Sequence, residues 1–171
     1  ARTSGPCSCA SPACAASPGK RESWPPYPEN KVQVKGFEET SFSNNFFDVA
    51  VGNVPFGEFK VSDRSYDKNN FLIHDYFFAK SIDKVRSGGV IAFITSSGTM
   101  DKKDDSIRRY IGARCELLGA IRLPNNTFKG MAGTEVTSDI IFLQKKESVI
   151  EREEPWYELG TDENGLNYNS Y

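Results

Sequence analysis

The feature that most constrains this chain of 171 residues is an apolar run, Phe46 to Gly52, that stops abruptly at Asn53-Val54-Pro55-Phe56-Gly57. A short apolar run that ends at Gly, Asn and Pro is typical of a buried strand in a parallel sheet, here residues 46–51. Ligands bind at the carboxyl ends of strands in open α/β sheets, so we expect Asn53, Pro55 and Phe56 at a functional edge. A plain tight turn is the alternative, since Asn and Pro are common turn residues.

The chain around this run alternates between strand and helix patterns. We expect strands at residues 31–35, 46–51, 90–94, 117–123 and 138–145, and helices at residues 70–86 and 106–114. The first helix should end at Gly88-Gly89, with the basic residues Lys84 and Arg86 in its last turn. After the strand at residues 90–94, we expect a loop over residues 95–99. This alternation predicts an α/β fold with a parallel sheet and helices on its faces.

The last two predicted strands flank a loop, residues 124–137, that shows no helical pattern. Strands joined without a helix pair antiparallel, so we expect a hairpin at one edge of the sheet. The predicted fold is therefore a mostly parallel sheet with a late antiparallel hairpin.

Composition sets limits on the possible functions. Hydrophobic residues make up 38% of the chain and charged residues 26%, which suits a folded domain. The net charge of -2, from 21 basic and 23 acidic residues, excludes a general polyanion-binding surface, so any nucleic-acid contact must be local. No apolar run is long enough for a membrane span and no signal-peptide pattern is visible. We therefore expect a cytoplasmic protein with no membrane partner.

Three of the four cysteines, Cys7, Cys9 and Cys14, lie near the start of the chain. Their C-x-C-x4-C spacing has no fourth ligand nearby, so we expect no metal site. Cys115 stands alone, and nothing indicates a disulfide framework, which fits a reducing compartment.

The two ends of the chain differ from its centre. Residues 1–26 are rich in Ala, Ser, Pro, Gly and Cys, and Trp24 is their only large apolar residue. They cannot bury enough apolar surface to offset the entropy of ordering, so we expect a disordered or artefactual segment. Residues 147–171 are charged and then carry Trp156 and Tyr157, and we expect them to begin a C-terminal extension.

With these elements placed, Asn53-Val54-Pro55-Phe56 resembles the Asn-Pro-Pro-Tyr/Phe motif of methyltransferases that act on amino groups. Residues 88–94 are similar to the next strand of that family. Leu123-Pro124 with Phe128, followed by the strand through residues 140–143, resembles the late segments of adenine-specific DNA methylases of the type I modification kind. The chain is most similar to the methylase part of helicase–methylase fusion proteins of phages and mobile elements.

The resemblance covers residues 28–171 and implies a Rossmann-like methyltransferase sheet, with residues 27–146 forming part of the catalytic domain. One departure is Val54, which replaces the first motif proline; the family uses the carbonyl of that residue, so Val is tolerable. The larger departure is the Gly-rich loop and acidic strand end that hold S-adenosylmethionine in the family, which have no counterpart in residues 1–30. The resemblance therefore implies a sheet that is incomplete at the N-terminus. It also implies a chain that is inactive alone and belongs to a larger parent methylase, which could include a fused helicase.

The resemblance implies methyl transfer from S-adenosylmethionine to the exocyclic amine of adenine in DNA. That amine is a poor nucleophile because its lone pair is delocalised into the ring. The Asn53 side-chain oxygen and the Val54 carbonyl would accept its two hydrogens and aim the lone pair, with Pro55 holding the backbone. Phe56 would stack on the flipped base. No general base is required, since the proton leaves after the methyl group has been transferred.

Further contacts follow from the same resemblance. Phe37 could pack on the adenosine of the methyl donor and Glu38 could accept from its amine; a buried Phe and a solvated Glu are the alternative. Phe128, with Lys129 beside it, is a candidate second wall for the target base, or a plain core aromatic. Apart from the resemblance, Lys102 and Lys103 begin a basic strip on and before the second predicted helix, which continues with Arg108, Arg109 and Arg114. The strip could contact phosphates or form a solvated face.

Two other candidates are weaker. His74, the only histidine, lies beside Asp75 within a predicted helix and is expected to be packed or half-exposed there, without a catalytic partner. Ser96-Ser97 lacks the Gly-x-Ser-x-Gly spacing of a nucleophile elbow.

Two rival functions stay open. The four-residue motif also serves methyltransferases that act on a protein glutamine amide or on RNA guanine, although the late Leu-Pro and Phe segment favours DNA. A non-catalytic remnant that binds nucleic acid or a partner protein would explain the missing donor loop.

Overall fold

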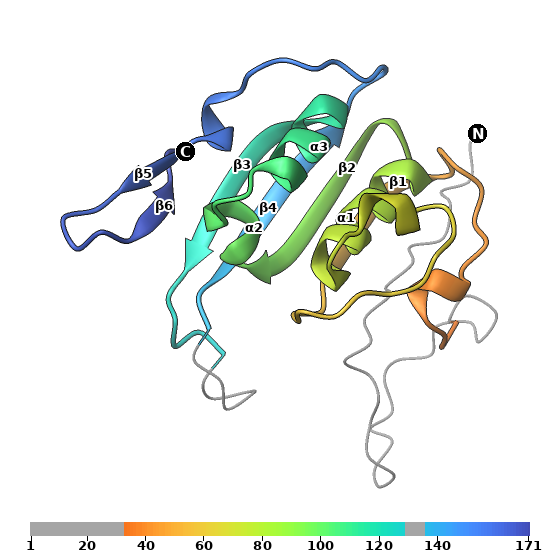
Figure 1. The fold of residues 1–171 in the computed structure, drawn as a ribbon. Coiled ribbons are helices and arrows are strands. Elements are labelled where there is room, and N and C mark those ends of the chain that lie inside the picture. Colours follow the sequence, from red (N-terminus) through yellow and green to blue (C-terminus); the bar gives the residue numbers. More distant parts are fainter. Residues whose placement is uncertain (1–32, 129–135) are drawn as a thin grey trace, which may run out of the picture.

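The computed structural model describes residues 33–128 and 136–171, and its centre is a four-stranded sheet with the order β1-β2-β4-β3 (Figure 1). The strands are β1 (Phe47–Asn53), β2 (Val85–Ser96), β3 (Cys115–Leu123) and β4 (Ser138–Lys145). The helices are α1 (Ile73–Lys84), α2 (Gly98–Asp101) and α3 (Ser106–Arg114). A separate two-stranded sheet pairs β5 (Leu159–Thr161) with β6 (Asn167–Asn169).

The strand directions confirm the predicted fold class. β1 runs parallel to β2, whereas β4 runs antiparallel to both β2 and β3. β1, β2 and β3 therefore point the same way, and β3 with β4 forms the expected hairpin at one edge. The carboxyl ends of β1, β2 and β3 meet at one side of the sheet, which we call the carboxyl edge. α3 and β4 have the predicted limits, while β3 begins at Cys115 rather than at residue 117.

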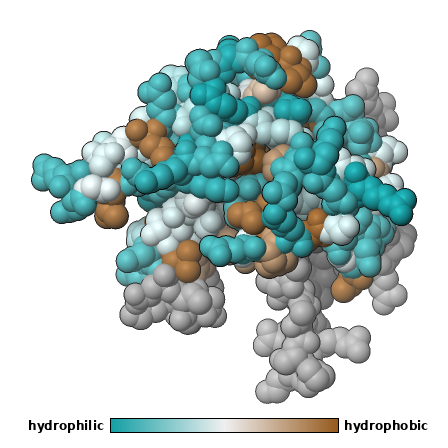
Figure 2. Space-filling model, in the orientation of Figure 1, coloured by the Kyte–Doolittle hydropathy of each residue, from teal (hydrophilic) through white to brown (hydrophobic). Residues whose placement is uncertain are grey.

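Helices α1 and α3 lie side by side on one face of the sheet (Figure 1). Phe71, just before α1, packs edge-on against Tyr110 of α3, with ring centroids 5.1 Å apart. Alternate residues of β2, including Ile91 and Phe93, are buried beneath these helices. From this side the surface is mostly hydrophilic, with separate hydrophobic patches (Figure 2). None of the described helices is long and apolar enough to cross a membrane.

The opposite face of the sheet is also apolar. The register places Val51 of β1, Ala92 of β2 and Phe142 of β4 in one row across the strands. Val51 is exposed, and Ala92 and Phe142 are only partly buried. Because α1 and α3 both pack on the first face, this row has no helix over it among the residues that the structure describes.

β1 is not the fully buried strand that its sequence predicts. It pairs with β2 on one side only within the described residues, so it forms an edge of the sheet. Val49 and Val51 are exposed on the face away from the helices, while Phe47 points to the core. The apolar run fits a strand with neighbours on both sides, and the described residues supply one neighbour.

The helix expected over residues 70–86 is shorter, and the strand after it is longer. α1 ends at Lys84 and β2 begins at the next residue, so Gly88-Gly89 lies inside the strand instead of ending the helix. Gly88 has a φ of +73°, which other residues rarely adopt, and the pairing with β1 shifts between Phe47 and Val49. The other end of β2 also differs from the prediction, because Thr95 and Ser96 are still in the strand and α2 takes Gly98 and Thr99 of the expected loop.

The strand expected at residues 31–35 is absent over residues 33–35, where Val34 is exposed. A 3-10 helix, Phe37–Glu39, follows instead. The alternating Val and Lys residues predict a strand only if a neighbouring strand pairs with them, and the described residues offer none. Residues 31 and 32, and the segment 1–26 predicted to be disordered, lie outside the described residues.

Residues 147–171 pack against the helical face. The ring of Tyr157 approaches Gly112 of α3 so closely that a Cβ atom there would overlap with its hydroxyl oxygen. Asn169 of β6 donates to the Met100 carbonyl of α2 at 3.0 Å. These contacts hold the extension against α2 and α3.

A buried lysine joins α1 to the segments on either side of β1. Lys80 Nζ donates to the carbonyls of Phe37 and Glu38, at 2.7 and 3.2 Å, and pairs with Asp63 Oδ2 at 3.0 Å. The Lys80 side chain is 4% exposed and that of Asp63 13% exposed. The Tyr76 hydroxyl donates to the same Asp63 oxygen at 2.9 Å. A charge this well buried requires such partners, because an unpaired ammonium in the core would be costly.

We expect Asp63→Asn to lower the free energy of unfolding by about 3 kcal/mol at neutral pH, because Lys80 would stay buried without its charged partner. Burial raises the pKa of Asp63, but hydrogen bonds from Lys80 and Tyr76 outweigh it and hold the pKa below its ordinary 3.8. A carboxylate with a depressed pKa stabilises the fold above its ordinary pKa and loses this contribution as the pH falls through the folded-state pKa. Urea unfolding of both proteins should therefore show a difference at neutral pH that shrinks in acid. Equal stability at neutral pH would contradict the role of the ion pair.

Candidate functional site

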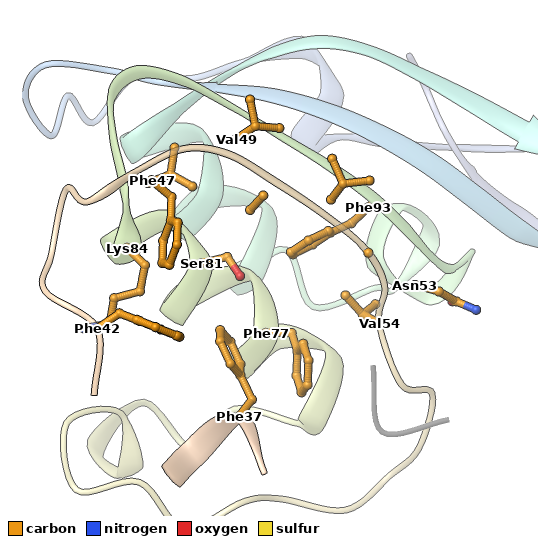
Figure 3. Close-up of a pocket in the computed structure, with 14 residues that line it drawn as sticks. Phe37, Phe42, Phe47, Val49, Asn53, Val54, Phe77, Ser81, Lys84 and Phe93 are labelled. Atoms are coloured by element: carbon orange, nitrogen blue, oxygen red, sulfur yellow. The ribbon is translucent and has the colours of Figure 1, made fainter. Parts of the chain in front are cut away.

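The end of β1 presents two successive side chains in opposite directions. Asn53 pairs with Ile94 of β2, and the Val54 N–H donates to the Ile94 carbonyl at 2.9 Å. Val54 points into a pocket beside α1, whereas the Asn53 side chain points away from it (Figure 3). Val54 is 2% exposed and Asn53 is exposed. The alternation of the strand thus anchors the backbone through Val54 and directs Asn53 outward at the carboxyl edge.

Two oxygen acceptors are available at this position. Within residues 33–128 and 136–171, neither the Asn53 side chain nor the Val54 carbonyl has a hydrogen-bond partner. Pro55 follows, and its ring restricts the backbone and removes one N–H donor. An amide oxygen and a backbone carbonyl therefore stand next to each other, free to accept from a molecule at the carboxyl edge.

Phe56 lies beside this pair, and its side chain is 40% exposed. Its role in base stacking stays a prediction. Gly57 comes next, and the ring of Phe59 lies against it, since a Cβ atom on Gly57 would be 2.6 Å from Phe59 Cε1. Phe59 is 56% exposed. Residues 58–69 are mostly polar, so nothing in their pattern predicts a site role for this aromatic residue.

The pocket in Figure 3 lies on the helical side of β1. Its walls are mainly aromatic and come from β1, α1, β2 and the residues before β1; they include Phe37, Phe42, Phe47, Phe77 and Phe93. Phe37, Asn53 and Val54 all line this pocket, and the amide group of Asn53 lies at its rim, pointing outward. The structure therefore brings Phe37 and Asn53 to one pocket, with the Asn53 amide turned toward the carboxyl edge.

The two predicted donor-site residues differ in exposure. Phe37 is half-buried, with its ring centroid 4.8 Å from that of Phe77 and 5.1 Å from Lys80 Nζ. Glu38 is exposed, and Lys80 donates hydrogen bonds to the backbone carbonyls of Phe37 and Glu38. The residues can therefore offer an aromatic edge and a free carboxylate from a fixed turn.

The predicted basic strip is divided by the structure. Arg108 is buried, and its guanidinium donates to the carbonyls of Tyr157 and Lys102, so it cannot belong to a solvated or phosphate-binding face. Arg109 pairs with Asp105 and Glu153, and Arg114 stacks on Tyr110. Arg108 is buried because residues 147–171 pack over α3, which the helical pattern alone does not reveal.

Three of the four remaining predicted contacts, Lys102, Lys103 and Phe128, lie in loops at the carboxyl edge. Lys102 directly follows α2 and is partly buried, and Lys103 is exposed. Phe128 lies in the turn after β3 and is half-buried. Lys129 lies outside the described residues. The roles of these four residues in binding a target base or DNA stay predictions.

An ion cluster that the sequence analysis missed holds β3 and β4 together at the carboxyl edge. Arg122 binds Asp139 with two hydrogen bonds, of 2.8 and 2.9 Å, and also pairs with Asp101 at 2.9 Å. Asp139 is 2% exposed. The sequence did hold a signal, since an aspartate at an inward position of a strand needs a buried partner. The cluster fixes both ends of the loop that carries Phe128.

His74 and Asp75 form a second buried polar pair, with Nε2 and Oδ1 3.2 Å apart. Burial raises the pKa of Asp75. His74 is packed within α1, as expected, and the pair has no nucleophile beside it in the described residues. Across residues 33–128 and 136–171, no three His, Cys, Asp or Glu side chains are arranged to hold a metal ion. Cys7, Cys9 and Cys14 lie outside the described residues.

Comparison with known proteins gives a family match. Residues 21–128 match the Eco57I restriction-modification methylase family. The chain is also 34% identical, over 128 residues, to the Defense against restriction protein B of Escherichia phage P1. That alignment covers 70% of this chain and 6% of the phage protein.

Solved structures share the fold at low sequence identity. The EcoKI M protein, from a type I restriction enzyme, matches with a TM-score of 0.52 and 16% identity, over 81% of this chain and 26% of that one. A chain from a type I restriction-modification complex matches with a TM-score of 0.52 and 22% identity, over 67% of this chain and 25% of that one. A putative class I S-adenosylmethionine-dependent methyltransferase of Listeria monocytogenes matches with a TM-score of 0.50 and 19% identity, over 67% of this chain and 37% of that one. The chain thus spans at most 37% of these relatives' lengths.

Stability measurements can separate the anchoring residue from the outward one. Val54→Ala should lower the free energy of unfolding by about 2 kcal/mol, because two buried methyl groups are lost and a cavity remains. Asn53→Ala should change it by less than about 0.5 kcal/mol, because the side chain is exposed and without internal partners. Urea unfolding of both variants tests this difference. A large destabilisation by Asn53→Ala would show that Asn53 is a structural turn residue.

Proposed function

The chain belongs to the Eco57I restriction-modification methylase family and has the fold of S-adenosylmethionine-dependent methyltransferases, and from this premise we propose that it carries the methyl-accepting side of an adenine-specific DNA methyltransferase site. The observation that supports this most is the pair of free acceptors, the Asn53 side chain and the Val54 carbonyl, at the carboxyl end of β1. The product would be DNA methylated on the exocyclic amine of adenine.

The two acceptors suit a primary aromatic amine. Each would take one of its two hydrogens, which draws the nitrogen lone pair out of the ring and aims it along one direction. Preorganised acceptors contribute more in the transition state than in the ground state, since they strengthen as positive charge develops on the nitrogen. Val54 supports this through its buried side chain and its hydrogen bond to Ile94, which fix the carbonyl. Phe56 would then hold the flipped base by stacking, worth ~1–3 kcal/mol.

S-adenosylmethionine, when bound, supplies an electrophilic methyl group. On this chain Phe37 and Glu38 are the residues that would hold its adenosine part: the first offers an aromatic edge and the second an exposed carboxylate. Lys80 fixes the backbone of both. The only Gly-Gly pair of the chain, Gly88-Gly89, lies inside β2, where it cannot form a strand–turn–helix cradle.

DNA would approach the carboxyl edge, where the loops after β1, β2 and β3 meet. Phe128 in the loop after β3 would provide a second wall for the base, with Lys129 next to it. Lys102 and Lys103, after α2, would contact phosphates. The partners proposed are therefore DNA and the remainder of a larger methylase, because the chain spans 6% of the phage relative. A fused helicase and a cytoplasmic location are part of the same proposal.

Two rival functions make different predictions. A methyltransferase for protein glutamine or RNA guanine would use the same acceptors on a different amine, and assays with DNA, RNA and release-factor substrates distinguish them. A non-catalytic remnant would bind nucleic acid or a partner protein without transferring a methyl group. The free acceptors favour catalysis over this second rival, since a remnant has no use for them.

In the complete methylase, Asn53→Ala should lower the rate of methyl transfer to DNA at least ~100-fold, because the lost acceptor acts mainly in the transition state. Donor affinity should change little. Asn164→Ala, in the exposed turn between β5 and β6, is the matched control and should leave the rate unchanged. Transfer of radiolabelled methyl groups to duplex DNA is the measurement. Activity within a few-fold of wild type would remove the main support for the proposal.

The 171-residue chain alone should bind S-adenosylmethionine with a dissociation constant above ~1 mM, or about 4 kcal/mol of binding at most. Phe37 and Glu38 can supply only one side of an adenosine pocket. Isothermal titration calorimetry of the chain with the donor measures this. Micromolar binding would show that residues assigned here to loops build the donor site.

A further inference from the structure

The loop after β1 presents a second exposed aromatic side chain that the proposed function does not use. Phe59 is 56% exposed, more than Phe56 at 40%. We propose that Phe59 is a second nucleic-acid contact, which stacks on an exposed base next to the target adenine. This inference rests on the proposed function and extends its binding site beyond the target base.

The backbone of Phe59 is anchored although its ring faces solvent. Its carbonyl accepts from the N–H of Ile73, the first residue of α1, at 2.9 Å. Ile73 itself is 4% exposed, so this hydrogen bond ties the loop to the core. The Phe59 ring lies against Gly57, where a Cβ atom would be 2.6 Å away and would push it out of place. A ring carried on an anchored backbone loses less conformational entropy when a ligand stacks on it.

Packing within the chain does not account for the position of the ring. Over residues 33–128 and 136–171, Phe59 belongs neither to the hydrophobic core nor to the partly buried residues packed against it, and it forms no aromatic pair. A ring left in water forgoes the free energy that burying its apolar surface would contribute. An aromatic surface with a planar, apolar ligand recovers that free energy, and a nucleobase is such a ligand.

The spacing limits which base the ring can reach. Three chain steps separate Phe56 from Phe59, so their Cα atoms are at most ~11 Å apart. Successive bases rise about 3.4 Å along one strand of DNA, so Phe59 can reach bases within a few positions of the one on Phe56. When the target is flipped out, the faces of its neighbours lose their stacking partner. Phe59 would cover one of these faces.

Phe46 provides a matched control for this proposal. It is also an exposed phenylalanine, at 51%, but it directly precedes β1 and so lies at the opposite end of that strand from Asn53. A general affinity of exposed aromatic rings for bases would involve both residues. A contact that belongs to the carboxyl edge would involve Phe59 alone.

The test uses the whole chain and short single-stranded thymidine oligonucleotides that carry one adenine. In one probe the fluorescent base 2-aminopurine replaces the adenine, and in the other it stands directly beside the adenine. Tryptophan quenches 2-aminopurine on contact. Phe59→Trp should quench the probe beside the adenine more than the probe in its place, and Phe56→Trp should do the reverse. Phe46→Trp should quench neither. Phe59→Ala should weaken binding about tenfold, whereas Phe59→Tyr should bind as wild type and Phe46→Ala should have no effect.

The outcomes separate the two proposals. If Phe59→Trp quenches neither probe, or Phe59→Ala binds as tightly as wild type, the Phe59 contact is wrong while the role of Phe56 stands. If Phe56→Trp fails to quench the probe in place of the adenine, the proposed function loses its base-binding residue, and the inference about Phe59 fails with it. Circular dichroism spectra that match wild type establish that each variant is folded.

Discussion

The site depends on the pairing of β2, because this strand is hydrogen-bonded on both sides. Its parallel ladder with β1 ends at Asn53 opposite Ile94, and its antiparallel ladder with β4 places Ser138 opposite Ser96. These two ladders bring the ends of β1 and β2 and the start of β4 to one edge. The residues proposed to bind the target base and DNA all follow strands that end there, so their meeting is a consequence of strand direction.

At that edge, two successive residues of the chain point to opposite sides of the sheet, one into the core and one outward. Val54 enters the core beside α1 and fixes the backbone, and the residue before it is turned to the other side with its amide free. The backbone carbonyl that the fold holds in place is one of the two acceptors proposed for the substrate amine. An anchored residue and an outward-facing acceptor thus stand next to each other.

Much of this arrangement could be predicted from local patterns, since the limits of α3 and β4 and the antiparallel direction of β4 follow from spacing and turn residues. The differences arise where distant segments decide. The burial of Lys80 and Arg108 depends on Asp63 and on residues 147–171, which a helical pattern cannot reveal. Gly88-Gly89 looks like a helix end in sequence, but pairing with β1 draws it into β2. Phe59 was not predicted as a site residue because its neighbours in sequence are polar, and its position against Gly57 is visible only in the structure.

The strand order has a consequence for how the chain folds. β4 lies between β2 and β3, although it follows both in sequence, so β3 has no place in the sheet until β4 is present. During synthesis on a ribosome, the edges of β2 and β3 that pair with β4 would stay unpaired until residue 145 had emerged. The contact between Lys145 and Asn45, 100 residues apart, cannot form before that point. Assembly should therefore be slow and all-or-none, with the apolar strands exposed to other chains in the interval.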